Sequence, residues 1–326
     1  MNLFVSVCIP TLNRASLLLS ALNSIFCDQS ILHSVEICIS NNCSEDDYSM
    51  VEVLLEKQSS SFKIHYKRHS QRISIDENHF YVASMASSEY IYFLGDDDFF
   101  FPGQFGLLCE FIRLEKPSLA VFSVIDSSKN RTLGSISSIK YSSVDSAFNS
   151  LWDKCKFGYI IVQRRLLAED SFRYLFGTAH AYGCFWLTLF DMQQKGENVA
   201  VILCNYSFVG SSCALKNYDF IFVWYVAITQ YLQLFQDKLE SNQSKKLLQS
   251  ILERHFTRVF SLRFLLSHLR DTDDILQIKQ ANPERYKANF LQFCFIRLLG
   301  LRFLKYCLGS AKLVRNSLSG IFSIWR

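Results

Sequence analysis

The sequence predicts an α/β protein with a mostly parallel sheet flanked by helices. Apolar runs of strand composition alternate with stretches of about 10–15 residues that have helical periodicity, which is typical of βαβ units. One run, Tyr90–Leu94, is aromatic and β-branched without any charge, so we expect a strand buried on both faces. Gly95 and three adjacent carboxylates, Asp96, Asp97 and Asp98, follow it directly.

The expected elements follow one another from the N-terminus. Strands are predicted over 5–9, 35–39, 63–67, 90–94, 120–125, 158–162 and 199–203. Helices are predicted after residue 11 and over 45–57, 76–86, 104–114 and 182–194. In the helix over 45–57, Met50, Val51, Val53, Leu54 and Leu55 form the apolar side. The pattern is helical from about residue 218 onward, which predicts two regions, 1–215 and 216–326.

Composition limits the class of protein. With 326 residues and 49% hydrophobic content, the chain can bury a sizeable core. The eleven cysteines are odd in number and include no C-x-x-C pair, so we expect buried thiols in a reducing compartment. Residues 1–9 lack the basic start of a secretory signal. The longest uncharged stretch, 220–236, contains three glutamines, which favours a buried helix over a membrane span.

Charge is distributed unevenly along the chain. The net charge is +4, yet no Asp or Glu occurs after Glu284, and residues 285–326 contain eight Lys and Arg. Residues 289–312 mix these cations with Phe, Leu and Ile, a pattern suited to a helix lying on an anionic membrane. The alternative is a helix packed on the rest of the protein. A nucleic-acid partner is not expected, because the rest of the chain is net acidic and carries no recognised nucleic-acid motif.

The three carboxylates predict a ligand site. Adjacent acids at the end of a buried strand repel one another and lose hydration, and a hard cation such as Mg²⁺ or Mn²⁺ relieves both costs. Ligands of open α/β sheets bind beyond the carboxyl ends of the strands, which is where these acids lie. The alternative is an acidic turn that caps a helix following Pro102.

Three sequence blocks resemble the family 2 glycosyltransferases, whose fold is GT-A, a Rossmann-like α/β fold. The family pattern is (V/I)-I-P-T-(Y/F)-N-R, an acidic or Asn-rich turn, and then (G/E)-(D/E)-Y-(I/V) leading to D-x-D-D. The matching stretches are Ile9–Arg14, Ile39–Asp46 and Ser88–Asp98. The likeness covers residues 4–104, and its Ser-Asn-Asn turn and Gly95 are most similar to O-antigen sugar transferases, abequosyltransferase-like ones among them.

The resemblance implies a nucleotide-sugar site. Pro10 and Thr11 would lie under the base and ribose, with Asn13 and Arg14 at the start of the following helix. Asn41 stands where the family usually has an Asp that binds the base, which leaves the nucleotide open. An Asn-Asn turn is the alternative for Asn41.

Two further positions belong to the same implied donor site. Asn78 matches a family Asn on the helix before the fourth strand, although a first-turn or capping residue explains it as well. Asp96 occupies the variable position of the acid motif.

The resemblance also implies a metal. Asp97 matches the metal-binding acid and Asp98 the acid that follows it, so Mn²⁺ or Mg²⁺ would bridge the donor diphosphate. Gly95 stands where the first acid of the motif often occurs, so one ribose or metal contact is missing.

The catalytic base is the least defined part of the implied site. Inverting members usually use a carboxylate of a Glu-Asp pair at a helix start, and residues 177–195 contain no such pair. His180 is the titratable group nearest that start, and imidazole can act as a base near neutral pH. An acceptor-binding or helix-start histidine is the alternative. The pair Glu169-Asp170, which reads as a loop or helix end, is a substitute candidate for the base. Asp191 lies about three turns beyond the expected helix start and is too remote.

These observations predict a glycosyltransferase. It would move a sugar from a nucleotide-sugar donor to a lipid-linked surface polysaccharide of the O-antigen type, in the cytoplasm at the inner face of the cell membrane. The rival is a catalytically silent GT-A-like nucleotide-binding or assembly protein. Nucleotidyl transfer also uses paired acids and a metal, but the stretch Thr11–Arg14 is not a Gly-rich phosphate loop.

Overall fold

The computed structural model describes residues 4–28, 34–123, 125–126, 135–152, 154–155, 158–211, 231, 234, 236, 239, 242–259 and 279–280. The chain divides into two compact units, Met1–Asn217 with Leu234–Ser244, and Tyr218–Gln233 with Lys245–Arg326. The predicted boundary at residue 215 and the basic stretch 285–326 lie outside the described residues and stay predictions.

The first unit is built on an eight-stranded sheet in the order β3-β2-β1-β4-β9-β6-β10-β8. Its strands are β1 (Val5–Thr11), β2 (Val35–Asn41), β3 (Lys63–Arg68), β4 (Tyr90–Phe93), β6 (Leu119–Phe122), β8 (Ser138–Lys140), β9 (Ile160–Gln163) and β10 (Val201–Cys204). β9 is antiparallel to β4 and β6, and β8 is antiparallel to β10, whereas the other pairs are parallel. The predicted mostly parallel sheet is confirmed.

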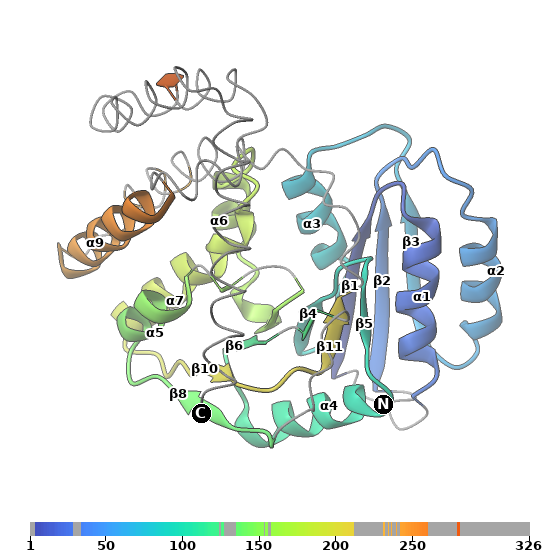
Figure 1. Cartoon of the computed structure of the whole chain (residues 1–326), viewed down its shortest axis with the longest axis horizontal. Coiled ribbons are helices and arrows are strands. Elements are labelled where there is room, and N and C mark those ends of the chain that lie inside the picture. The colour runs from blue at the N-terminus through green and yellow to red at the C-terminus, as the bar shows by residue number, and fades with distance from the viewer. Residues whose placement is uncertain are drawn as a thin grey trace, which may run out of the picture. The chain divides into compact units, whose positions relative to one another are not determined.

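Helices cover both faces of this sheet. They are α1 (Ala15–Phe26), α2 (Ser49–Gln58), α3 (Ile75–Ser84), α4 (Gln104–Glu115), α5 (Val144–Leu151), α6 (Glu169–Tyr174) and α7 (Cys184–Gln194). Figure 1 shows α1 and α2 on one side of β1 to β3 and α3 on the other. Right-handed crossovers explain this, because the chain moves from β1 to β3 in one direction and returns to β4 in the other.

The third acid, Asp98, belongs to a second sheet of three strands. It runs in the order β5 (Asp98–Phe100), β11 (Val209–Ser211) and β7 (Ile125–Asp126). β5 and β11 are antiparallel, with Asp98 opposite Ser211. The acid segment therefore ends in a strand rather than in a helix. α4 begins later, at Gln104 after an N-cap at Gly103, so the acids do not cap it and the capping alternative is wrong.

Several predicted elements differ from the structure. The first strand continues through Pro10 to Thr11, because both residues still pair with β2. On α2, Met50 and Val53 are 65% and 60% exposed, so their assignment to the apolar side is wrong. The helix starts at Ser49, and only the face with Val51 and Leu55 turns to the core.

Two further boundaries are corrected. Asn78 does not open its helix, since Ser74 is the N-cap and forms a capping box with Glu77. The strand predicted over 120–125 ends at Phe122, and Ile125 belongs to the second sheet. The stretch Asn242–Val259 forms α9 and is helical as predicted. Within the described residues, none of the helices combines the length and the apolar character that crossing a bilayer requires.

Candidate active site

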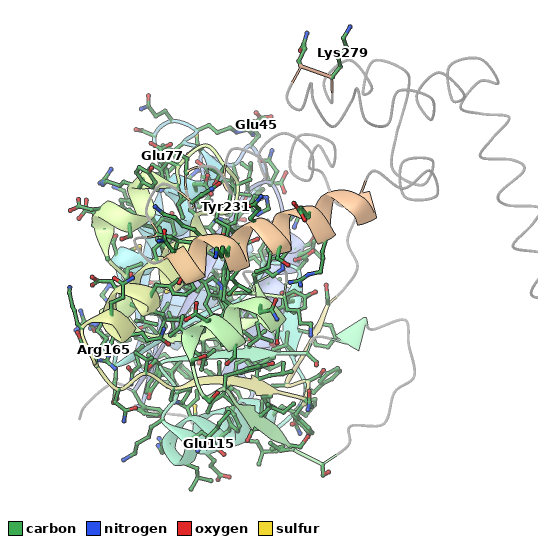
Figure 2. The ribbon with its side chains drawn as sticks, turned by 90° about the vertical axis from the view of Figure 1, so that its left-hand side faces the viewer. Glu45, Glu77, Glu115, Arg165, Tyr231 and Lys279 are labelled. Atoms are coloured by element: carbon green, nitrogen blue, oxygen red, sulfur yellow. The ribbon has the colours of Figure 1, made fainter. Side chains whose placement is uncertain are left out.

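The residues predicted to bind the donor and the metal lie at the carboxyl ends of neighbouring strands. β1 ends at Thr11, β2 at Asn41 and β4 at Phe93, and these three strands are parallel neighbours. Figure 2 shows Glu45, which follows β2, and Glu77, in the first turn of α3, at the same end of the molecule, opposite Glu115 at the end of α4. This end of the sheet is where ligands of parallel α/β folds bind.

Asp96 ties the acid segment to the end of β1. Its carboxylate accepts hydrogen bonds from the Thr11 hydroxyl at 2.9 Å and from Nη1 of Arg14 at 3.0 Å. Burial raises the pKa of Asp96, and Arg14 and Thr11 offset part of that rise. The residue that sequence comparison places at a variable position is therefore a structural link between two strand ends.

Asp97 is the acid that faces outward. Its side chain is 23% exposed, against 8% for Asp96, and its Oδ2 lies 3.5 Å from Nη1 of Arg14. The Arg14 guanidinium thus lies between two carboxylates. Burial lowers its pKa, and the charges of Asp96 and Asp97 outweigh that effect, so the net shift is upward. Arg14 is held as a cation beside the acid segment.

Asp98 is buried in a tight space between two glycines. A Cβ placed on Gly95 or on Gly158 would lie 2.7 Å from Oδ2 of Asp98. Burial, followed by the charge of Asp97, raises the pKa of Asp98 to about 7, although the hydroxyl of Ser211 donates to it. The space explains the missing first acid of the motif, because the Asp98 carboxylate occupies the volume that a side chain at position 95 would need.

The turns after β1 and β2 are bonded to each other. Asn13 has a φ of 54°, its amide donates to the Ser44 hydroxyl at 2.9 Å, and its Oδ1 accepts from the Glu45 amide at 2.8 Å. The hydroxyl of Tyr48 lies 2.9 Å from Thr11 Oγ1 and 3.2 Å from Ser44 Oγ. Tyr48 was missed by sequence reasoning, because an aromatic residue before a helix carries no motif.

Asn41 is buried and its amide is used within the protein. Oδ1 accepts from the Ser44 amide at 3.0 Å, and Nδ2 donates to the Tyr66 hydroxyl at 3.1 Å. The left-handed residue of this turn is Cys43, with a φ of 55°, rather than either asparagine. Asn41 therefore shapes the turn through its side chain.

Asn78 joins α3 to the end of β2. Its Oδ1 accepts from the Ser40 hydroxyl at 2.6 Å, and its Nδ2 donates to the Ser40 carbonyl at 3.4 Å. Asn42 makes a parallel link, exchanging two hydrogen bonds with the backbone of Ile73. These asparagines hold α3 against the edge where the site lies.

His180 lies on a buried loop that leads into α7. It is 2% exposed, precedes the short 3₁₀ helix η3 (Ala181–Gly183), and its Nδ1 lies 2.8 Å from the Tyr182 hydroxyl. The structure connects this loop to α3 through Asp76, a residue that sequence reasoning also missed. Asp76 is 1% exposed, and its Oδ2 accepts from the Ala179 amide at 2.9 Å.

The other acids considered as bases lie on α6 and α7. Glu169 and Asp170 are the first two residues of α6, so the predicted helix-end position is confirmed, and Glu169 pairs with Arg173 at 2.7 Å. Asp191 is exposed and pairs with Lys195 at 2.6 Å. Asp170 and Asp191 line one small pocket between the two helices.

The residues present fit a metal ion that is held by one protein carboxylate and otherwise by the phosphates of a bound substrate. Within the part of the chain that the structure describes, no group of three or more His, Cys, Asp or Glu side chains is placed to hold a cation. Of the three acids, Asp96 is bonded to Arg14 and Thr11, and Asp98 to Ser211, which leaves Asp97 the most accessible. Mg²⁺ is commonly bound by one or two carboxylates together with substrate phosphates, and Asp97 suits that arrangement.

Solved structures share this fold. The crystal structure of S. aureus TarS 1–349 superposes with a TM-score of 0.60 at 14% identity, covering 95% of this chain and 92% of that one. The complex of the same protein with UDP-GlcNAc gives a TM-score of 0.58 at 14% identity and the same coverage. The protein is thus of the GT-A class, with an acid motif and a strand-end turn at the ligand-binding edge.

The sequence comparison then defines the family. The model of glycosyl transferase family 2 matches residues 6–194, more than half of the chain, so the chain belongs to that family. The chain is also 36% identical over 97 residues to the abequosyltransferase RfbV of Salmonella typhimurium strain LT2. That match covers 29% of this chain and 28% of the relative. The predicted family and fold are confirmed.

Proposed function

We propose that this protein is a glycosyltransferase that moves a sugar from a nucleotide-sugar donor to a lipid-linked polysaccharide of the O-antigen type. The observation that carries the proposal is the acid segment at the carboxyl edge of the sheet, joined to the end of β1 through Arg14 and Thr11. A leaving nucleoside diphosphate is stabilised by positive charge, and Arg14 together with a metal held by Asp97 would supply that charge at one place.

Each side chain has a distinct part in the proposed site. Arg14 would bind a diphosphate oxygen, since a guanidinium held between two carboxylates remains charged. Asp97 would hold Mn²⁺ or Mg²⁺, with Asp98 behind it as the second predicted acid. The cation supplies Lewis-acid stabilisation of the leaving nucleoside diphosphate. Thr11 and Asp96 fix Arg14 relative to Asp97, so the charges are ordered before the donor arrives.

The donor proposal draws on structural neighbours. S. aureus TarS, which shares the fold, has been crystallised in complex with UDP and with UDP-GlcNAc. In the present chain the turn that would lie under the base and ribose contains Pro10, Thr11 and Asn13, and Asn41 closes the neighbouring turn. Asn41 does not indicate which nucleobase is bound, because its side-chain amide is already hydrogen-bonded to Ser44 and Tyr66.

The acceptor side is proposed from the relative and from the sequence. The matched relative is an abequosyltransferase, which supports a sugar of the surface-polysaccharide type as substrate. His180 would take the proton of the acceptor hydroxyl as general base. The basic stretch 285–326 would hold the protein at an anionic membrane surface, where a lipid carrier presents the acceptor. Flotation with anionic vesicles tests this part: equal binding by a chain lacking residues 285–326 would refute it.

The metal and donor site are tested together by thermal stabilisation and by release of nucleoside diphosphate. UDP-, CDP- and GDP-sugars are screened with and without Mn²⁺, and the best donor is then assayed with the variant Asp97→Asn. We expect Asp97→Asn to lose the Mn²⁺-dependent stabilisation and about 10²-fold or more in turnover. The matched control is Asp191→Asn, which removes an exposed acid paired with Lys195. Wild-type turnover in Asp97→Asn would overturn the metal assignment.

A catalytically silent nucleotide-binding protein is the second candidate. It is favoured by the internal hydrogen bonds of two expected site residues, Asn41 to Ser44 and His180 to Tyr182. The same screen separates the candidates. Mn²⁺-dependent stabilisation by a donor without any nucleoside diphosphate release would establish the silent protein and refute the enzyme.

A further inference from the structure

The carboxylate of Asp76 is enclosed by backbone amides of a distant loop. Asp76 lies in the first turn of α3 and is 1% exposed. Its Oδ2 accepts from the Ala179 amide at 2.9 Å and its Oδ1 from the Ala181 amide at 3.3 Å, across 103 and 105 residues of sequence. Burial raises its pKa, and hydrogen bonds from the backbone amides of Ala179, Ala181, Gly177 and Thr178 offset part of that rise.

The loop that Asp76 binds has a conformation that it would not adopt readily by itself. Ala179 has a φ of 54° and Gly177 a φ of 83°. The left-handed region is unfavourable for a residue with a Cβ, because that atom approaches the following carbonyl oxygen. An alanine stays there only when the surroundings hold it, and the amides that converge on Asp76 provide that restraint.

The same loop leads to the acid segment. His180 follows Ala179 directly, and α7 starts four residues later, at Cys184. The Phe185 ring on α7 packs against Phe93, with ring centroids 5.8 Å apart. Phe93 is the last residue of β4 and stands two positions before Gly95. A shift of the loop would therefore change the position of His180 relative to the end of β4.

We propose that Asp76 is the positioning residue that holds loop 177–181, and with it His180, in the geometry that sugar transfer requires. The inference rests on the proposed function, because it gives the loop a part in that reaction. Asp76 would not contact a reacting atom. It would act through its hydrogen bonds to the backbone of Ala179 and Ala181.

Two substitutions and a matched control isolate this effect. Asp76→Ala removes both acceptor oxygens, and Asp76→Asn keeps one of them at nearly constant volume. The control Asp145→Ala removes a first-turn aspartate of α5, whose carboxylate accepts from Gln193 at 2.9 Å and from Ser244 at 3.0 Å. Both aspartates stabilise a helix start, so loss of stability alone affects both variants.

Three measurements are made on the full-length chain. Amide hydrogen exchange reports the order of residues 177–181. The Mn²⁺-dependent thermal shift with the best donor of the screen reports the donor site. Nucleoside diphosphate release gives kcat, KM and their pH profile. We expect Asp76→Ala to lose amide protection at 177–181 and about 10²-fold in kcat, with donor KM changed by less than about threefold. Asp76→Asn should retain part of kcat, and Asp145→Ala all of it.

A rescue variant separates positioning from folding. In Asp76→Ala/Ala179→Gly, glycine adopts the positive φ without steric cost, so the loop regains its path and part of kcat returns. A folded Asp76→Ala that shows wild-type kcat and pH profile would overturn the inference alone. A wild-type chain that releases no nucleoside diphosphate from any donor would overturn the proposed function and the inference with it.

Discussion

Thr11 and Asp96 are 85 residues apart in sequence, and the Thr11 hydroxyl donates to the Asp96 carboxylate at 2.9 Å. The bond joins the end of β1 to the acid segment after β4, and Arg14 adds a second link to the same carboxylate at 3.0 Å. The proposed donor site is therefore assembled from two strand ends that hold each other in place without a ligand.

Removal of Arg14 should weaken both the fold and donor binding. Arg14→Ala leaves the buried Asp96 carboxylate with Thr11 as its remaining partner, so we expect the free energy of unfolding to fall by about 1–3 kcal/mol. Arg14→Lys should restore only part of that stability. Lysine keeps the positive charge but lacks the planar set of donors of a guanidinium. Urea unfolding measures the first effect and donor KM the second.

The control for Arg14 is Lys195→Ala, which breaks an exposed ion pair with Asp191 at the end of α7. Such exposed pairs contribute little, so its unfolding curve should match the wild type closely. If Arg14→Ala were as stable as Lys195→Ala and bound the donor normally, the linking role of Arg14 would be refuted.

Gly158 should tolerate no side chain because of Asp98. In Gly158→Ala the new Cβ would meet Oδ2 of Asp98 at 2.7 Å, and the φ of 87° would add strain. Gly196→Ala is the matched control, since its φ is 73° with nothing within 4 Å. We expect Gly158→Ala to lose about 1–3 kcal/mol more than Gly196→Ala in thermal or urea unfolding. Equal losses would show that the Asp98 carboxylate moves aside freely.

Glu36 should make stability depend on acid pH. It is buried on β2 and accepts from Ser6 and the Ser87 and Ser88 turn, with Lys63 at 3.1 Å. Burial alone would raise its pKa, but these hydrogen bonds outweigh it and lower the pKa from 4.5 to about 2.

A lowered pKa means that the folded state binds this proton less readily than the unfolded state. The contribution is therefore complete above pH 4.5 and is lost as the pH falls toward 2, and its size is about 3 kcal/mol. Urea unfolding of wild type and Glu36→Gln between pH 7 and pH 3 should show a difference that shrinks with acidification. A difference independent of pH would contradict the assignment.

Sequence periodicity predicted the alternation of strands and helices well, because buried strands and amphipathic helices leave local signatures. Periodicity was wrong where the burial of a residue depends on which other element packs against it. Met50 and Val53 carry the apolar character of a core face, but they are exposed, and α2 buries Val51 and Leu55 instead. The sequence also carried no sign that the strand ends at Phe122, because Ile125 pairs in the second sheet.

The motif indicated three candidate acids but not how their surroundings differ. Asp96, Asp97 and Asp98 are chemically identical in the sequence, and they differ only through their surroundings. Arg14 and Thr11 bind Asp96. Asp97 is the most exposed of the three. Gly95, Gly158 and Ser211 lie around Asp98. Asp76 carried no sequence signal, because its partners are backbone amides more than 100 residues away.

The sequence by itself determined the α/β class, the family and the position of the acid motif after a buried strand, because these depend on local composition and on short motifs. The tertiary structure alone decided how the roles divide among three adjacent aspartates, why position 95 is glycine, and that Asp76 holds the loop of His180. Those properties arise from distances between residues far apart in the chain, and only folding sets such distances.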